Sequence, residues 1–226
     1  MGKNLKTAVI IGATGNLGQA LVKQLSAAKY KIDSTWLGDD HPDSSKEDSY
    51  RFLPEQIDLA VYLAGITHSH KTEEMPLADW QRVLDVNLTG AFLLAKHAFT
   101  GLKKGQGTFV TISSINATHP YPRRVAYAAT KSALEGLTRE LAVEWGQYGI
   151  STHCLRLGHL SKLMKTTDLN PQILSLIQKR IPSGRLIEPK DVASYILWLA
   201  EGGARAVSGT VVDFDPAYVI NIKPLT

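Results

Sequence analysis

Short apolar segments alternate with longer helical segments along the whole chain, and this alternation limits the fold more than any other feature. The strand-like segments are rich in β-branched residues, and the segments between them carry apolar residues at helical spacing. The expected strands cover residues 7–11, 31–36, 58–65, 107–114, 150–158 and 209–215, and the expected helices cover 16–28, 77–102, 124–148, a short stretch at 172–180, and 189–202. Strands and helices of these lengths predict an α/β fold with a doubly wound parallel sheet covered on both faces.

Charge and cysteine content exclude several classes of protein. The net charge is +4, but the Lys and Arg residues are scattered, so nucleic acid is not an expected partner. Cys154 is the one cysteine, which rules out an internal disulfide and favours a reducing compartment. No apolar run approaches the roughly 18 residues of a membrane span, and "GATG" interrupts "AVII" too early for a signal peptide. We therefore expect a cytoplasmic protein with no membrane partner.

A glycine-rich turn follows the first expected strand. In "VIIGATGNLGQAL", Gly12, Gly15 and Gly18 lie just after that strand and at the start of the first helix. Glycine lets the backbone turn tightly and approach a pyrophosphate closely, and the helix start supplies free N–H groups and a positive dipole end. A glycine trio alone is equally well explained by a tight turn. In this strand–turn–helix context it predicts binding of a dinucleotide.

The stretch "YAATK" places Tyr127 and Lys131 four residues apart within the expected helix at 124–148. Four residues are about one helical turn, so both side chains lie on one face. By spacing alone, an ordinary solvated pair is a better explanation than a phenol held beside a cation for proton chemistry.

Four stretches in order, "GATGNLG", "DVNLTGAF", "VTISSI" and "YAATK", together resemble the short-chain dehydrogenase/reductase family. Ser114 precedes Tyr127 by 13 residues and Asn87 precedes Ser114 by 27, spacings typical of the family's catalytic tetrad. The resemblance covers nearly the whole chain. It implies one Rossmann-type domain over residues 1–226, NAD or NADP as cofactor, and a small alcohol or carbonyl as substrate.

The resemblance also implies a role for each tetrad residue. Tyr127 is the general acid and base, and Lys131 lowers its pKa and binds the nicotinamide ribose. Ser114 holds the substrate oxygen, and Asn87 anchors a water in the proton relay. The expected cofactor contacts are Gly12, Thr14, Gly15, Asn16, Leu17, Gly18, Trp36, Ala64, Gly65, Asn87, Tyr127, Lys131 and Gly158.

Several positions depart from the family's pattern. Asn16 replaces the middle glycine of the loop, "YLAG" at 62–65 replaces two asparagines, and Leu157 stands before Gly158 in place of a proline. The gap between the second strand and "YLAG" is about half the family's usual length, which indicates that a helix, with or without a strand, is reduced there. Trp36 falls where an acidic residue would select NAD or an arginine would accept NADP. Asp39 and Asp40 follow it and shift the expectation slightly to NAD.

Two other features complete the expectations. His68 and His70 could be metal ligands, but no acidic residue or cysteine completes a recognisable set in the sequence, so we interpret them as solvated loop residues and expect no metal. The helices at 77–102 and 124–148 carry apolar residues beyond one face, which predicts a homodimer or homotetramer. The residues behind this prediction are Phe92, Leu93, Leu134, Leu137 and Leu141.

Two alternative functions stay open on the same fold. A cofactor-sensing regulator without catalysis is compatible with the altered cofactor motifs, although the intact tetrad argues against it. A nucleotide-sugar-modifying enzyme is suggested only by the style of the glycine loop.

Overall fold

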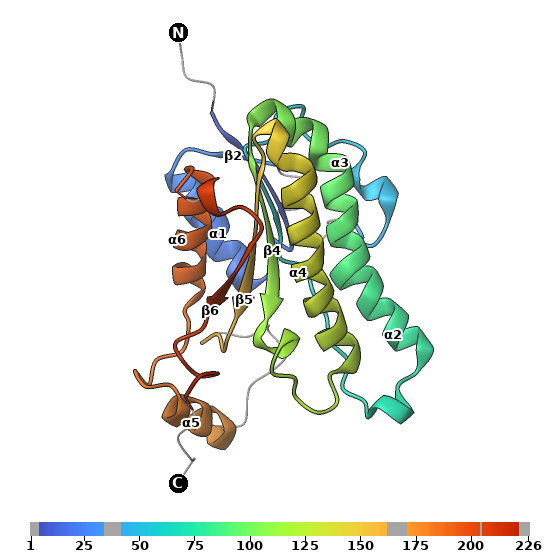
Figure 1. The fold of residues 1–226 in the computed structure, drawn as a ribbon, viewed down its shortest axis with the longest axis vertical. Helices are drawn as coiled ribbons and strands as arrows, with labels where there is room; N and C mark the ends of the chain where they lie inside the picture. The colour runs from blue at the N-terminus through green and yellow to red at the C-terminus, as the bar shows by residue number, and fades with distance from the viewer. Residues whose placement is uncertain (1–4, 34–41, 162–170, 204, 222–226) are drawn as a thin grey trace.

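A parallel sheet in the strand order β2-β1-β3-β4-β5-β6 forms the centre of the computed structural model (Figure 1). The structure describes residues 5–33, 42–161, 171–203 and 205–221. Its strands are β1 Thr7–Ile11, β2 Lys31–Ile32, β3 Leu59–Tyr62, β4 Thr108–Ser114, β5 Ser151–Leu157 and β6 Thr210–Phe214. Its longer helices are α1 Asn16–Ala27, α2 Leu77–Leu84, α3 Gly90–Gly105, α4 Val125–Trp145, α5 Pro171–Arg180 and α6 Pro189–Ala200. Its short helical turns are η2 Glu47–Tyr50, η3 Thr72–Glu74, η4 Asp85–Thr89, η5 Ile115–Ala117, η6 Gly146–Tyr148 and η7 Arg205–Val207.

Helices cover both faces of this sheet. Helices α1 and α6 pack on one face, and α2, α3 and α4 lie on the other (Figure 1). Every residue of β3 and β4 is buried, as expected for central strands of a sheet covered on both sides. The predicted doubly wound α/β fold is therefore confirmed. Within the described residues, no helix combines the length and the hydrophobicity needed to cross a membrane.

The chain reverses direction across the sheet between β1 and β3. Strand β2 pairs with one edge of β1 and β3 with the other, and Ile11 lies level with Tyr62. In open parallel sheets, ligands bind at the carboxyl ends of the strands where such a reversal occurs. This places the expected cofactor crevice beside the segments that follow β1 and β3.

Two predicted elements differ from the structure. The strand expected at 31–36 is only Lys31–Ile32, at the edge of the sheet, and residues 34–41 lie outside the described residues. The segment 77–102, for which the sequence allowed one long helix or a broken one, is two helices joined by a π-helical turn, η4, and the second helix continues past the predicted end to Gly105. A π turn widens the helix locally and is often found at functional sites. The described part of the segment between β2 and β3 holds η2, and its shortening relative to the family stays an interpretation.

The apolar residues on α3 and α4 are mostly not on a free surface, and this part of the sequence interpretation was wrong. Leu93, Leu134 and Leu141 are 6%, 1% and 7% exposed because they pack with β3, β4 and each other in the chain's own core. Leu137 packs against the same core, whereas Phe92 is 50% exposed.

Candidate active site

The four tetrad residues come together at the carboxyl end of the sheet. Ser114 ends β4, Tyr127 and Lys131 lie in the first two turns of α4, and Asn87 lies in η4. The Ser114 hydroxyl lies beside the Tyr127 phenol and acts to lower its pKa. Lys131 Nζ is 5.5 Å from the centroid of the Tyr127 ring. A hydroxyl, a phenol and an ammonium group therefore share one place, as the spacing in the sequence predicted.

Burial dominates the electrostatics of Tyr127 and Lys131. Lys131 is 5% exposed, its Nζ donates to the backbone oxygen of Ile112 at 2.7 Å, and burial lowers its pKa to about 8. Burial raises the pKa of Tyr127, while the Ser114 hydroxyl and the charge of Arg124 act in the opposite direction. The expected lowering of the tyrosine pKa is thus not found in the chain alone. Desolvation of the phenolate outweighs the effects of the Ser114 hydroxyl and the Arg124 charge.

Asn87 fixes the segment after β3 beside the tetrad. The side chain is fully buried, and its Oδ1 accepts from the backbone N–H of Ile66 at 2.8 Å. Its Nδ2 donates to the backbone oxygen of Ile66 at 3.0 Å and to Thr130 Oγ1 at 3.1 Å. Thr130 Oγ1 in turn donates to the backbone oxygen of Tyr127 at 2.9 Å. Both side-chain N–H groups of Asn87 donate in these contacts. The contacts hold the site in place, and neither N–H group is left to donate to a water.

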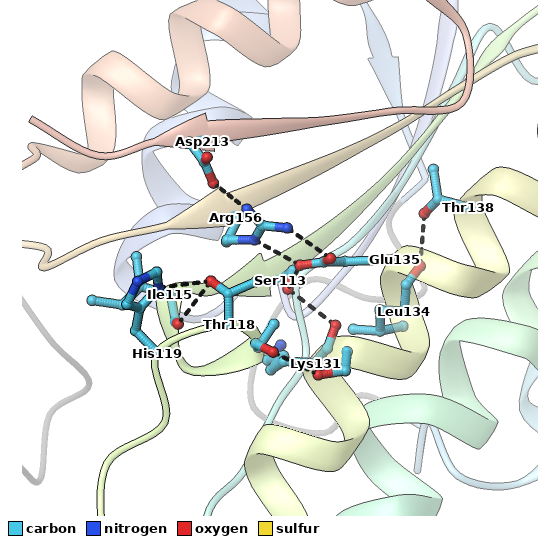
Figure 2. Close-up of polar contacts among 12 residues, drawn as sticks. Ser113, Ile115, Thr118, His119, Lys131, Leu134, Glu135, Thr138, Arg156 and Asp213 are labelled. Carbon is cyan, nitrogen blue, oxygen red and sulfur yellow. Dashed lines mark hydrogen bonds and ion pairs between the residues drawn. The ribbon is translucent and has the colours of Figure 1, made fainter. Parts of the chain in front are cut away.

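A buried ion-pair network fixes α4 on the sheet one turn beyond Lys131 (Figure 2). Arg156 of β5 donates through Nε and Nη2 to the two carboxylate oxygens of Glu135, both at 2.8 Å. Ser113 Oγ lies 2.9 Å from Glu135 Oε1 and 3.0 Å from the backbone oxygen of Lys131. Burial would raise the pKa of Glu135, but the hydrogen bonds from Arg156 and Ser113 outweigh it and lower that pKa. This network connects β4, β5 and α4 beside the tetrad.

The glycine loop needs glycine for two different reasons. Gly12 has φ +86°, and a Cβ there would lie 2.8 Å from the backbone nitrogen of Ala64. A Cβ on Gly18 would lie 2.4 Å from the backbone oxygen of Gly12. At Gly12 and Gly18, close packing within the chain itself therefore requires glycine. A Cβ on Gly15 would meet only the Gly12 oxygen at 3.6 Å, so chain packing does not require glycine there. Gly15 leaves space in which a ligand can approach the backbone.

The start of α1 suits an anion. Gly15 is the N-cap, no side chain makes a cap hydrogen bond, and the first turn holds no acidic residue. Thr14 precedes the cap and its backbone oxygen accepts from Gln19 Nε2 at 2.9 Å, while Asn16 and Leu17 begin the helix. Free N–H groups at a helix start are a site for phosphate. The residues present therefore fit the pyrophosphate of a dinucleotide.

The loop after β3 joins the glycine loop to the tetrad. Ala64 lies against Gly12, and a Cβ on Gly65 would be 3.5 Å from Lys131 Nζ and 3.6 Å from Asn87 Oδ1. Tyr62, which replaces a family asparagine, points into the core and donates its hydroxyl to the backbone oxygen of Val86.

Gly158 and Trp36 are the other two expected cofactor residues. A Cβ on Gly158 would lie 2.2 Å from Asp215 Oδ1, so packing against Asp215 is sufficient to require glycine there. Trp36 lies in the 34–41 segment, outside the described residues.

A pocket of about 290 Å³ opens at Ile115, the residue that follows Ser114. Its lining comes from the segment after β4, from α5 and from the chain after β6: Ile115, His119, Pro120, Tyr121, Arg180, Tyr218 and Val219. Tyr121 donates its hydroxyl to the Tyr218 hydroxyl at 3.0 Å, and the Arg180 guanidinium lies 4.8 Å from the Tyr218 ring centroid. The sequence did not point to Arg180 or Tyr218, because no local pattern links them to Ser114.

Comparisons with known proteins agree with this geometry. A family model described as enoyl-(acyl carrier protein) reductase matches residues 45–217. The 2-dehydro-3-deoxy-D-gluconate 5-dehydrogenase of Bacillus subtilis is 30% identical, over 95% of this chain and 94% of that protein. The 3-oxoacyl-(acyl-carrier-protein) reductase of Aquifex aeolicus is 31% identical, over 91% and 84%. A crystal structure of 3-oxoacyl-(acyl-carrier protein) reductase from Brucella melitensis superposes with a TM-score of 0.80 at 26% identity, over 93% and 90%.

Proposed function

The chain belongs to the short-chain dehydrogenase/reductase family of oxidoreductases, and on that premise we propose that it interconverts an alcohol and a carbonyl with Tyr127 as general acid and base. The observation that carries the proposal is the proximity of the Ser114 hydroxyl to the Tyr127 phenol, with Lys131 Nζ 5.5 Å from the centroid of the Tyr127 ring. The relatives named for such activities support the reaction class.

In carbonyl reduction, the Ser114 hydroxyl and the Tyr127 phenol both hydrogen-bond the carbonyl oxygen of the substrate. Tyr127 gives its proton to that oxygen as negative charge develops there, and Lys131 stabilises the phenolate that remains. Alcohol oxidation is the reverse, with the phenolate as proton acceptor. NAD or NADP, when bound, supplies or accepts the hydride. Asn87 and the Glu135–Arg156 pair hold these residues in place through the contacts described above.

In the chain alone, the titration of the two groups favours loss of the lysine proton first. Burial raises the pKa of Tyr127 and lowers the pKa of Lys131 to about 8, so the group deprotonated near pH 8 is Lys131 and not the phenol. The role of Tyr127 as a base therefore requires a lower phenol pKa in the loaded site than in the chain alone.

A substrate panel tests the proposal. Ketones, hydroxy acids, nucleotide sugars and simple alcohols would be offered with each cofactor, and reduced nicotinamide followed by its absorbance. Turnover of an alcohol or carbonyl supports the proposal. Cofactor binding without turnover of any panel member favours the regulator, and turnover confined to nucleotide sugars favours the sugar enzyme. Ser114→Ala, which removes one hydroxyl, is the matched control for background reduction.

For the cofactor, we expect a modest preference for NADH over NADPH. Acidic residues that follow the second strand repel a 2′-phosphate, and Asp39 and Asp40 stand at that place in the sequence. Titration of the apo protein with each reduced cofactor, followed by fluorescence, measures both affinities. An about tenfold preference for NADPH, equal to about 1.4 kcal/mol, would contradict the expectation.

We also expect a homodimer or homotetramer. Phe92 on α3 and Val143 on α4 remain 50% and 80% exposed, and symmetric closure is the commonest way to cover such side chains. Light scattering at micromolar concentration measures the mass. The 24.7 kDa of a single chain would contradict the prediction, and Phe92→Glu should shift an oligomer toward that mass.

A further inference from the structure

Two histidines and an aspartate gather at the surface next to the proposed active site. His68 and His70 lie in the segment after β3, and Asp79 lies in the first turn of α2. One donor atom from each of the three lies within 4.8 Å of the other two. The sequence interpretation set the histidine pair aside because no acidic residue completed a ligand set, and that reason was wrong. Asp79 is nine residues beyond His70, and only the turn into α2 brings it back.

Two of the three distances between the donor atoms are close to those of a metal site, and the third is within 4.8 Å. His70 Nε2 is 2.8 Å from Asp79 Oδ2, and His68 Nδ1 is 3.5 Å from the same oxygen. Two ligands of a tetrahedral Zn²⁺ ion, each at 2.0–2.2 Å, lie about 3.3 Å apart. Both distances are within about half an ångström of this value, so small side-chain rotations would suffice.

The arrangement is more than one hydrogen-bonded pair. A single hydrogen bond explains why His70 approaches Asp79, but not why His68 turns a ring nitrogen toward the same oxygen. The two imidazole rings are stacked, with centroids 6.3 Å apart and planes 10° apart. The His97–Glu47 pair elsewhere on the surface shows the ordinary case: its nitrogen and oxygen are 3.1 Å apart, and a lysine takes the place of a second histidine.

We propose that His68, His70 and Asp79 bind a divalent transition-metal ion, with Zn²⁺ as the ion that fits best. Two imidazoles and one carboxylate suit zinc and its neighbours, whereas Mg²⁺ and Ca²⁺ require oxygen ligands. The three side chains are 37%, 32% and 33% exposed, so water can reach the ion and complete its coordination.

The proposed ion has a structural consequence for the active site. The segment that carries the two histidines is held by Asn87 at Ile66, and by Arg124, whose Nη1 donates to Thr67 Oγ1 at 2.8 Å. An ion at His68 and His70 would attach the next residues of this segment to α2. Zn²⁺ should therefore slow amide hydrogen exchange in residues 66–70, a readout that does not depend on catalysis.

Calorimetric titration of the tag-free chain with Zn²⁺ tests the site directly. The wild type should bind one ion, and Mg²⁺ or Ca²⁺ in excess should not displace it. His70→Gln and Asp79→Asn should each weaken binding more than the about tenfold that loss of even an outer-shell partner can cost. His97→Gln removes a histidine from the comparison pair and should leave the affinity unchanged.

Two further measurements make the result unambiguous. Thermal melting without metal shows whether each variant is folded, and Co²⁺ in place of Zn²⁺ reports histidine coordination through its visible absorption. The proposal is overturned if the folded His70→Gln and Asp79→Asn variants bind Zn²⁺ as tightly as the wild type. It is also overturned if the wild type shows no more binding than a variant that lacks all three side chains.

Discussion

Replacing Tyr127 with phenylalanine should lower kcat by about 10²–10⁴, the usual contribution of general acid–base catalysis, and leave cofactor affinity nearly unchanged. The change removes one hydroxyl and little volume from a half-buried ring, so the fold should persist. Rates with the best substrate of the panel and a cofactor titration measure the two effects separately. If the variant keeps more than about a tenth of the wild-type activity, the tetrad assignment is wrong.

The pH profile gives the same prediction a second readout. In the wild type, the alcohol-oxidation rate should rise with pH through an apparent pKa well below the roughly 10 of free tyrosine, because Tyr127 must lose its proton to act as the base. Carbonyl reduction needs that proton and should fall over the same range. In Tyr127→Phe, the residual oxidation rate should lack this step. A step near 10 in the wild type would show that Lys131 has no influence on the phenol.

Lys131→Met should lower both kcat and cofactor affinity. The substitution keeps the length of the aliphatic chain but removes the ammonium group, so the phenolate loses a nearby cation and the proposed ribose contact disappears. We expect a loss of kcat comparable to that of Tyr127→Phe, together with weaker binding of the cofactor. Unchanged cofactor affinity with a reduced kcat would restrict Lys131 to the proton chemistry.

Measurements of stability test whether Lys131→Met acts on the chemistry of the site or on the fold. Because its pKa is about 8 in the folded chain and about 10.4 in an unfolded one, the unfolded chain holds the extra proton between these values. The contribution of Lys131 to the free energy of unfolding therefore rises as pH increases from about 8 to about 10.4. Denaturant melts of wild type and Lys131→Met across that range should show the rise in the wild type alone.

Local patterns determined much of this protein. The strand and helix segments could be predicted because a short run of β-branched apolar residues, or apolar spacing with a period of 3.6 residues, acts within one element. Tyr127 and Lys131 share a face because both lie on α4, and the glycine turn follows β1 because the strand ends there. The place of Ser114 beside Tyr127 was predicted only through the spacing of the family's motifs, since these residues lie on different elements.

Only the tertiary structure decided which distant residues meet and how water is excluded from them. Asp79 joins His68 and His70 because α2 turns back over the segment after β3, and no periodicity encodes that meeting. Leu134 belongs to the chain's own core because α4 packs against the sheet, so a sequence pattern could not distinguish it from an exposed leucine. The pKa of Lys131 near 8 depends on desolvation by every neighbouring element, a property of the packed molecule and not of the "YAATK" stretch.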